Sequence, residues 1–245
     1  MALILAVDTS ATPVSCALLQ DERVLASCYN HSGQTHSQTL MPMIEHTLHL
    51  SGVTVAQLDA LAVNVGPGSF TGVRIGVSTV KGLAFSDDIP CIAVSTLESM
   101  AELLRSLPMD AQICCVMDAR CQQVYTAAFA LDAEGNLTRQ TADEAISVEE
   151  LENRLKKVEK PIILVGDGAK MCYTILKDAV PSLTLAPPML LFQSAVGTAL
   201  VARRKLAQGE TVSAAALMPA YLRLPQAERE LRARQAAGSA AHKTQ

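Results

Sequence analysis

Apolar runs of strand length alternate with stretches of helical spacing through the first hundred residues. The apolar segments 3–7, 14–19 and 24–29 are separated by short polar turns, which predicts three strands joined as hairpins. A continuous apolar run at 58–65 predicts a buried fourth strand, and a short fifth strand is expected around 91–93. The spacing of apolar residues predicts helices at about 34–50, 69–85 and 97–107.

The second half of the chain repeats this order. Strands are predicted at 113–117, 124–131 and 161–165, with a helix at 148–158 and a glycine turn at 166–168. Asp118 precedes residue 124 by the same interval as Asp8 precedes residue 14. A repeat with a period near half the chain indicates two similar lobes and not a solenoid, whose period would be far shorter.

We therefore expect an α/β protein with a mixed sheet and flanking helices in each lobe. The first lobe is assigned to residues 1–107 and the second to 108–225, with a helix at 190–208 that packs back on the first lobe. The segment 226–245 is rich in Ala, Arg and Gln and has little to bury, so it is predicted to be a disordered tail.

Each predicted lobe begins with a hairpin that follows a carboxylate, which is the plan of the two-lobed actin-like ATPases (the ASKHA superfamily, with RNase H-like lobes). In that plan a glycine two residues after the first aspartate lets the backbone approach a phosphate. This chain has Ser10 at that position. Asp8 is thus either a remaining metal or nucleotide contact or a turn residue that bonds its own hairpin, and the missing glycine favours the turn.

The glycine-rich segment 66–74 joins a predicted strand to a predicted helix. It is not a Walker A loop, because Val73 stands where that loop has lysine, and it lacks the G-x-G-x-x-G spacing of dinucleotide-binding folds. Gly66 and Gly68 permit a tight turn, and the free N–H groups at the start of the helix would accept an anion. Asp8, Gly66 and Gly68 are therefore weak candidates for cofactor binding, and no firm cofactor site is predicted.

The helix predicted at 69–85 has an unusually wide apolar arc. Its remaining narrow stripe consists of Arg74, Ser78, Lys81 and Phe85. A helix at the surface of a lone globule needs an apolar face of only about 100°, and the arc here is roughly twice that. Three glycines in an exposed helix would each cost about 1 kcal/mol relative to alanine, which predicts close packing at Gly72, Gly76 and Gly82. Burial within the chain and burial under a partner helix both remain open.

Composition and motif searches exclude several kinds of site. The net charge of −4 offers no basic footprint for nucleic acid, so any RNA must be held by another protein. No histidine pair has the i, i+4 spacing of a helical metal site, and no nucleophile signature is present. Seven cysteines without a C-x-x-C pair, and the lack of a signal peptide or membrane-spanning run, predict a cytoplasmic protein with reduced thiols.

Motifs along most of the chain point to one family. The segments that carry the likeness are 4–10, 36–42, 94–97, 118–120 with 124–125, 219–223 and, above all, the glycine-rich segment 66–76. They resemble the TsaB family, also called YeaZ, in order from about residue 2 to residue 224. Gln123 departs from the family's usual glutamate before Val-Tyr, which argues against a charged role at that position.

The resemblance implies a non-catalytic subunit of the bacterial machinery that makes threonylcarbamoyladenosine (t6A) beside the anticodon of tRNA. It implies a heterodimer with the catalytic subunit TsaD, the ATPase TsaE as a further partner, a homodimer through the same surface, and only indirect contact with tRNA. No cofactor is expected on this chain, whereas ATP and a metal are expected on the partner subunits. The family's interface uses the first two helices of the first lobe, and the contact residues implied here are His36, Leu40, Met43, Ile44, Thr47, Phe70, Val73, Arg74, Gly76, Val77, Val80 and Lys81.

Two enzyme hypotheses compete with this interpretation. The first is a small-molecule kinase or ATPase that would use Asp8, Asp118 and the glycine turns. The second is a degenerate glycoprotease-like metallopeptidase, for which the histidine spacing supplies no metal site.

Overall fold

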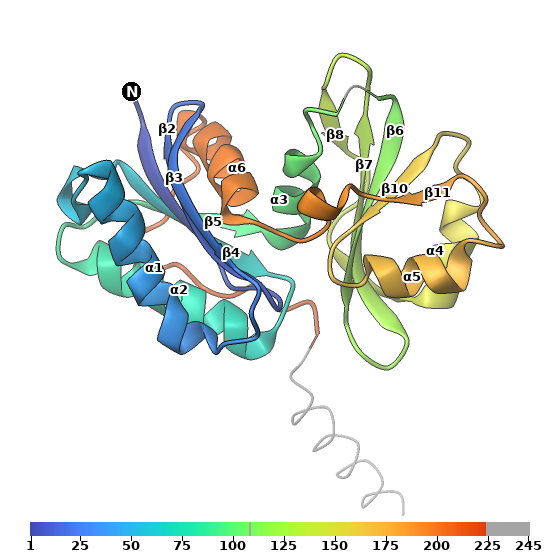
Figure 1. Ribbon diagram of the computed structural model, residues 1–245, viewed down its shortest axis with the longest axis horizontal. Helices are drawn as coiled ribbons and strands as arrows, with labels where there is room; N and C mark the ends of the chain where they lie inside the picture. Colours follow the sequence, from blue (N-terminus) through green and yellow to red (C-terminus); the bar gives the residue numbers. More distant parts are fainter. Residues whose placement is uncertain (108, 224–245) are drawn as a thin grey trace, which may run out of the picture.

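The computed structural model describes residues 1–107 and 109–223; the tail predicted at 226–245 lies outside this part. Two lobes lie side by side, each built on a sheet with helices on its faces (Figure 1). No helix in the described part of the chain is both long enough and apolar enough to cross a membrane.

The first lobe contains a five-stranded mixed sheet in the order β3-β2-β1-β4-β5. The hairpins are antiparallel, whereas β1, β4 and β5 run parallel. The strands are β1 (Leu3–Asp8), β2 (Val14–Gln20), β3 (Arg23–Asn30), β4 (Ala60–Gly66) and β5 (Cys91–Ser95). The helices that follow β3 and β4 are α1 (His36–Ser51) and α2 (Phe70–Phe85), with a short 3₁₀ helix at Val55–Gln57.

Alternation along the central strands divides the first lobe's core into two layers. Leu5 and Val63 belong to the apolar cluster that includes α1 and α2. Their neighbours Ile4 and Ala62 belong to a second cluster with α6 (Ala195–Ala207), on the opposite face of the sheet. Helices thus cover both faces, which explains why β1 and β4 are continuous apolar runs.

The second lobe contains a six-stranded mixed sheet in the order β11-β10-β6-β7-β8, with β9 paired to β7. The strands are β6 (Ala111–Asp118), β7 (Gln123–Leu131), β8 (Leu137–Arg139), β9 (Glu144–Ser147), β10 (Ile162–Val165) and β11 (Leu183–Leu185). The helices of this lobe are α4 (Val148–Leu155) and α5 (Ala169–Leu176). The predicted repeat is confirmed, because β6 pairs antiparallel with β7 and parallel with β10, as β1 does with β2 and β4.

Two helices cross between the lobes and lie in the middle of the molecule (Figure 1). Helix α3 (Thr96–Leu103) follows the first sheet, yet its Leu97 and Met100 are part of the second lobe's core. Helix α6 follows the second sheet and packs on the first, as the sequence predicted. The two helices cross closely at Gly197, where an added Cβ would lie 2.2 Å from the carbonyl oxygen of Ser99.

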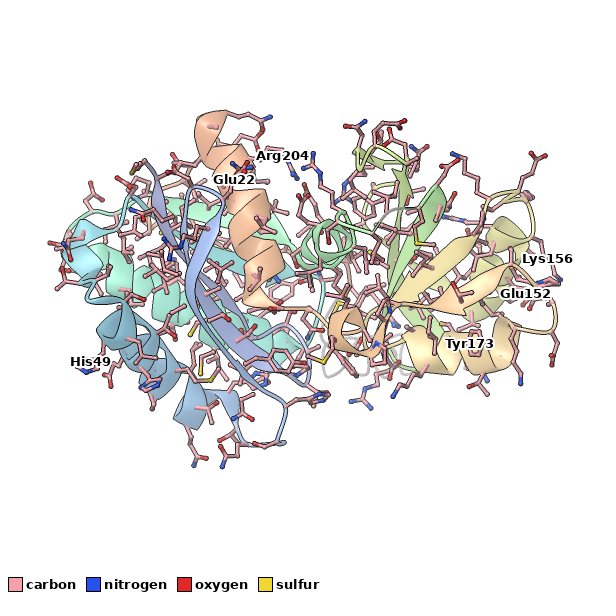
Figure 2. All side chains as sticks on the ribbon, turned by 45° about the horizontal axis from the view of Figure 1, so that its top comes forward. Glu22, His49, Glu152, Lys156, Tyr173 and Arg204 are labelled. Carbon is pink, nitrogen blue, oxygen red and sulfur yellow. The ribbon has the colours of Figure 1, made fainter. Side chains whose placement is uncertain are left out.

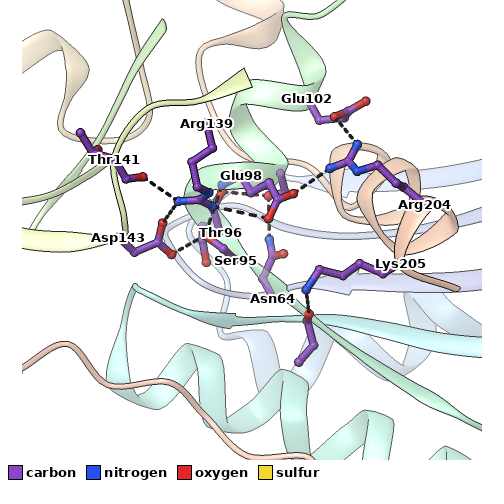
Figure 3. A network of polar contacts seen from close by, with 12 residues as sticks. Asn64, Ser95, Thr96, Glu98, Glu102, Arg139, Thr141, Asp143, Arg204 and Lys205 are labelled. Carbon is purple, nitrogen blue, oxygen red and sulfur yellow. Dashed lines mark hydrogen bonds and ion pairs between the residues drawn. The ribbon is translucent and has the colours of Figure 1, made fainter. Parts of the chain in front are cut away.

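A polar network ties these crossing helices to the second lobe (Figure 3). The guanidinium of Arg204 on α6 donates to Glu98 at 2.7 Å and to Glu102 at 2.9 Å, both on α3. Arg139 on β8 donates to Asp143 at 2.6 Å and also reaches Glu98. One connected set of charges therefore joins α6, α3 and the second sheet.

The helix predicted at 190–208 is shorter than expected. Residues Pro188–Leu190 form a 3₁₀ helix, and α6 begins only at Ala195, where the hydroxyl of Ser194 accepts a hydrogen bond from the N–H of Val196. The side chains at 190–192 pack against or within the second lobe's core instead of continuing α6. The short elements α5 and β11 were not predicted.

Candidate functional site

The loop between β1 and β2 is sealed by hydrogen bonds from its own side chains. Oδ1 of the fully buried Asp8 accepts hydrogen bonds from the backbone N–H of Ser10 at 2.9 Å and from its hydroxyl at 2.6 Å. Its Oδ2 accepts from Nδ2 of Asn64 at 2.5 Å. Burial raises the pKa of Asp8, and these hydrogen bonds oppose that rise. The bonds to Ser10 are those that the turn interpretation of Asp8 predicts, and Asn64 on β4 adds a third.

The glycine turn packs against this same loop. A Cβ on Gly68 would lie 2.3 Å from the carbonyl oxygen of Ser10, and the N–H of Ser69 donates to that oxygen at 2.6 Å. Gly66 has φ of 126°, and a Cβ there would lie 2.5 Å from the carbonyl oxygen of Ala220. Glycine is thus required at both positions by neighbouring backbone of this chain.

Helix α2 lies directly against the hairpin loop through two of its glycines. The hydroxyl of Thr9 donates to the carbonyl of Gly72 at 2.7 Å. A Cβ on Gly72 would lie 2.1 Å from the carbonyl oxygen of Thr9, and one on Gly76 would lie 2.4 Å from its Oγ1. The prediction of close packing is confirmed at both positions, and the neighbour is Thr9 of the same chain, not a partner helix. Gly82 has no neighbour within 4 Å of such a Cβ in the described part of the chain, so packing within this chain is not the reason for glycine there.

A cleft of about 1000 Å³ separates the two lobes at this end of the sheets. Its walls include the Ser10–Thr12 and Pro67–Thr71 segments of the first lobe and Asp118, Arg120 and Asp167 of the second. Asp118 donates its N–H to Oδ1 of Asp167 at 3.2 Å, and its own Oδ1 accepts from the N–H of Arg120 at 2.7 Å. Burial raises the pKa of Asp167 to about 6, with the carboxylate of Asp118 adding to the rise.

Asp8 does not line this cleft, whereas Gly68 and Asp118 do. Two histidines, His31 and His36, also lie on its wall. Within residues 1–107 and 109–223, no group of three or more His, Cys, Asp or Glu side chains is arranged to hold a metal ion.

Most of the contact residues implied for a partner form the core of the first lobe. The buried ones are Leu40, Met43, Ile44, Thr47, Val73, Gly76, Val77 and Val80. His36, Phe70 and Lys81 are half-buried, and Arg74 is exposed. The buried residues support the two helices but are not available to another protein. The exposed large apolar side chains on these two helices are instead Met41, Leu50 and Phe85, the last of which is 85% exposed.

A C-terminal segment, residues 212–223, covers one flank of α2, and we call it the strap. Lys81 Nζ donates to the carbonyls of Ala215 and Leu217, each at 3.2 Å. Arg74 Nε donates to the hydroxyl of Tyr221 at 2.7 Å. These bonds hold the strap along the polar stripe of α2, and its buried Leu217 joins the apolar cluster that contains Val73, Val77 and Val80. Sequence reasoning missed this role, because the strap has no periodicity and its only signal was the family motif at 219–223.

The fold and the structure of the hairpin loop define the class of protein to which this chain belongs. Two lobes with repeated hairpins after strand-ending carboxylates, joined by crossing helices, are built as in the actin-like ATPase (ASKHA) superfamily. Component A of (R)-2-hydroxyglutaryl-CoA dehydratase from Acidaminococcus fermentans shares this fold, with a TM-score of 0.51 and 12% identity over 84% of this chain and 100% of that one.

Comparison with known proteins places the chain within that class. The family model described as TsaD, tRNA N6-adenosine threonylcarbamoyltransferase, matches residues 30–231. The tRNA threonylcarbamoyladenosine biosynthesis protein TsaB of Escherichia coli is 32% identical over 220 residues, which is 90% of this chain and 94% of that protein. The structure of YeaZ from Pseudomonas aeruginosa matches with a TM-score of 0.72 and 29% identity, over 91% of this chain and 100% of that one. The chain belongs to the TsaB (YeaZ) family.

Proposed function

We propose that this chain is a non-catalytic subunit that pairs with a TsaD-type threonylcarbamoyltransferase and supports its modification of tRNA. The relatives it resembles along nearly their whole length are named for threonylcarbamoyladenosine biosynthesis. The chain also matches the family model of the transferase itself, so the two subunits would share one fold.

The observation that carries the proposal is the state of Asp8. Three donors from its own lobe occupy both of its carboxylate oxygens, and none of its surface reaches the solvent. Its role in an ATPase would require those oxygens to face a metal or a phosphate in the cleft. In this chain the hydroxyl of Ser10 donates to one of those oxygens instead, and the proposal therefore assigns the catalytic work to the partner.

The solvent-facing side of α1 and α2 is the proposed docking face. Exposed Leu50 and Phe85 give it one apolar anchor on each of two helices that pack against the same sheet. A second copy of this chain would use the same face in the absence of the transferase. TsaE, ATP and the metal would join through the partner. The partner would also hold the tRNA, because a chain of net charge −4 has little attraction for phosphates. The complex would work in the cytoplasm.

The direct test is a titration of the purified chain with TsaD by calorimetry. Val77 and Gly76 are unsuitable sites because both are buried, so the variant is Phe85→Asp. The matched control is Ile175→Asp on α5, where the apolar side chain is 54% exposed in the second lobe. We expect Phe85→Asp to weaken binding at least tenfold and the control to bind as the wild type.

Equal affinity of all three proteins for TsaD would contradict the docking face. Magnesium-dependent binding of ATP by the isolated chain, lost in Asp8→Ala, would instead favour the ATPase hypothesis. Reconstitution of tRNA modification with and without this chain would test the functional claim independently of the interface.

A further inference from the structure

The strap is held to the first lobe along its whole course. Val212 pairs with Cys91 through hydrogen bonds of 2.9 and 2.8 Å, and Leu217 is fully buried in the first lobe's core. The N–H of Ala220 then donates to the carbonyl of Val65 at 2.8 Å, at the end of β4. Since Lys81 bonds the middle of the strap and Arg74 bonds its later part, the strap runs antiparallel beside α2. It therefore behaves as a fixed element of the first lobe's surface.

The outward side of this fixed segment is apolar. Met218 is 66% exposed, Tyr221 is 44% exposed and Leu222 is 38% exposed, while Leu217 points into the core. Apolar side chains held on a rigid backbone lose little conformational entropy when they are covered. Methionine and tyrosine are also among the residues enriched at protein interfaces.

Tyr221 connects the strap to the exposed side of α2. Its ring lies 5.0 Å from that of Phe70, and the guanidinium of Arg74 lies 3.8 Å above the Phe70 ring. Arg74 also donates to the hydroxyl of Tyr221. These three side chains form one stacked unit, which joins the strap to the solvent-facing side of α2 at Arg74, while Phe70 and Tyr221 also border the cleft between the lobes.

We propose that the strap is the second half of the docking surface, with Met218 and Tyr221 in direct contact with the TsaD-type partner. This inference rests on the proposed function. The occupant it requires is an apolar partner surface that carries a carboxylate near Arg74, because Arg74 is the exposed cation of the stacked unit. The strap would hold α2 in place before binding and become part of the interface on binding.

The test compares Met218→Asp and Tyr221→Ala with Met189→Asp in calorimetric titrations with TsaD. Met189 is a matched control, since it is an exposed methionine (92%) on a 3₁₀ helix in the second lobe. We expect Met218→Asp and Tyr221→Ala each to weaken binding about tenfold or more and Met189→Asp to change it less than twofold. Thermal unfolding of each variant identifies any loss of folding, and Tyr221→Phe retains the ring without its hydroxyl.

The outcomes separate the two proposals. If Phe85→Asp weakens binding while folded Met218→Asp and Tyr221→Ala bind within twofold of the wild type, the strap inference is wrong and the α1–α2 face stands. If none of these variants changes the affinity, both proposals fail. If Met218→Asp or Tyr221→Ala abolishes self-association of this chain in analytical ultracentrifugation but leaves its affinity for TsaD unchanged, the strap belongs to a homodimer interface and the inference is overturned.

Discussion

The carbonyl oxygen of Thr9 lies 2.1 Å from the position that a Cβ on Gly72 would take, and the hydroxyl of Thr9 donates to the carbonyl of Gly72. The hairpin loop of the first lobe is thereby fixed to the first turns of α2. The same contact sets the orientation of the helix that forms half of the proposed docking face.

Replacing Gly72 by alanine is expected to destabilise the protein by about 1–3 kcal/mol, because the added methyl group must displace backbone of the hairpin loop. Gly82→Ala on the same helix is the matched control. It has open space around its Cβ position and is expected to stabilise by roughly 0.5–1 kcal/mol, through helix propensity alone. Urea unfolding followed by circular dichroism measures both. Equal effects of the two substitutions would show that Thr9 does not restrict the helix.

The network between the lobes is expected to contribute more than an exposed ion pair. Arg204→Met removes the guanidinium that bonds Glu98 and the largely buried Glu102, with an expected loss of about 1–3 kcal/mol in unfolding free energy. Lys156→Met is the control, since Lys156 pairs with Glu152 at the outer end of the second lobe (Figure 2). That pair is solvent-exposed, and its loss is expected to cost less than about 0.5 kcal/mol. A similar cost for both variants in chemical denaturation would remove any special role for the network.

The carboxyl group of Asp167 is expected to titrate near pH 6 in an NMR experiment on the folded protein, above its ordinary value of 3.8. Because the native state then binds more protons than the unfolded chain between these values, this group makes the unfolding free energy fall as the pH rises through that window. Asp167→Asn should remove this part of the pH dependence, so that the variant gains stability relative to the wild type from pH 4 to pH 7. A titration near pH 4, or parallel stability curves, would contradict the assignment.

The sequence by itself determined the two-lobed architecture. Three local signals predicted it, and the structure confirms each of them: continuous apolar strands, a carboxylate before each hairpin, and the glycine turns at 66 and 166. The substitution of Ser10 for glycine also predicted the turn role of Asp8, because a residue two positions away can bond the carboxylate whatever the rest of the fold does.

The tertiary structure alone decided which surfaces of α2 are covered and by what. Helical periodicity indicated that most of this helix is buried, but it cannot distinguish a sheet, a neighbouring hairpin loop, a distant segment of the same chain and another protein. Here Thr9 covers Gly72 and Gly76, and the strap, some 140 residues away along the chain, holds Arg74 and Lys81. Contacts between segments so far apart leave no periodic trace in either segment, so the accessible part of the proposed interface had to come from the folded chain.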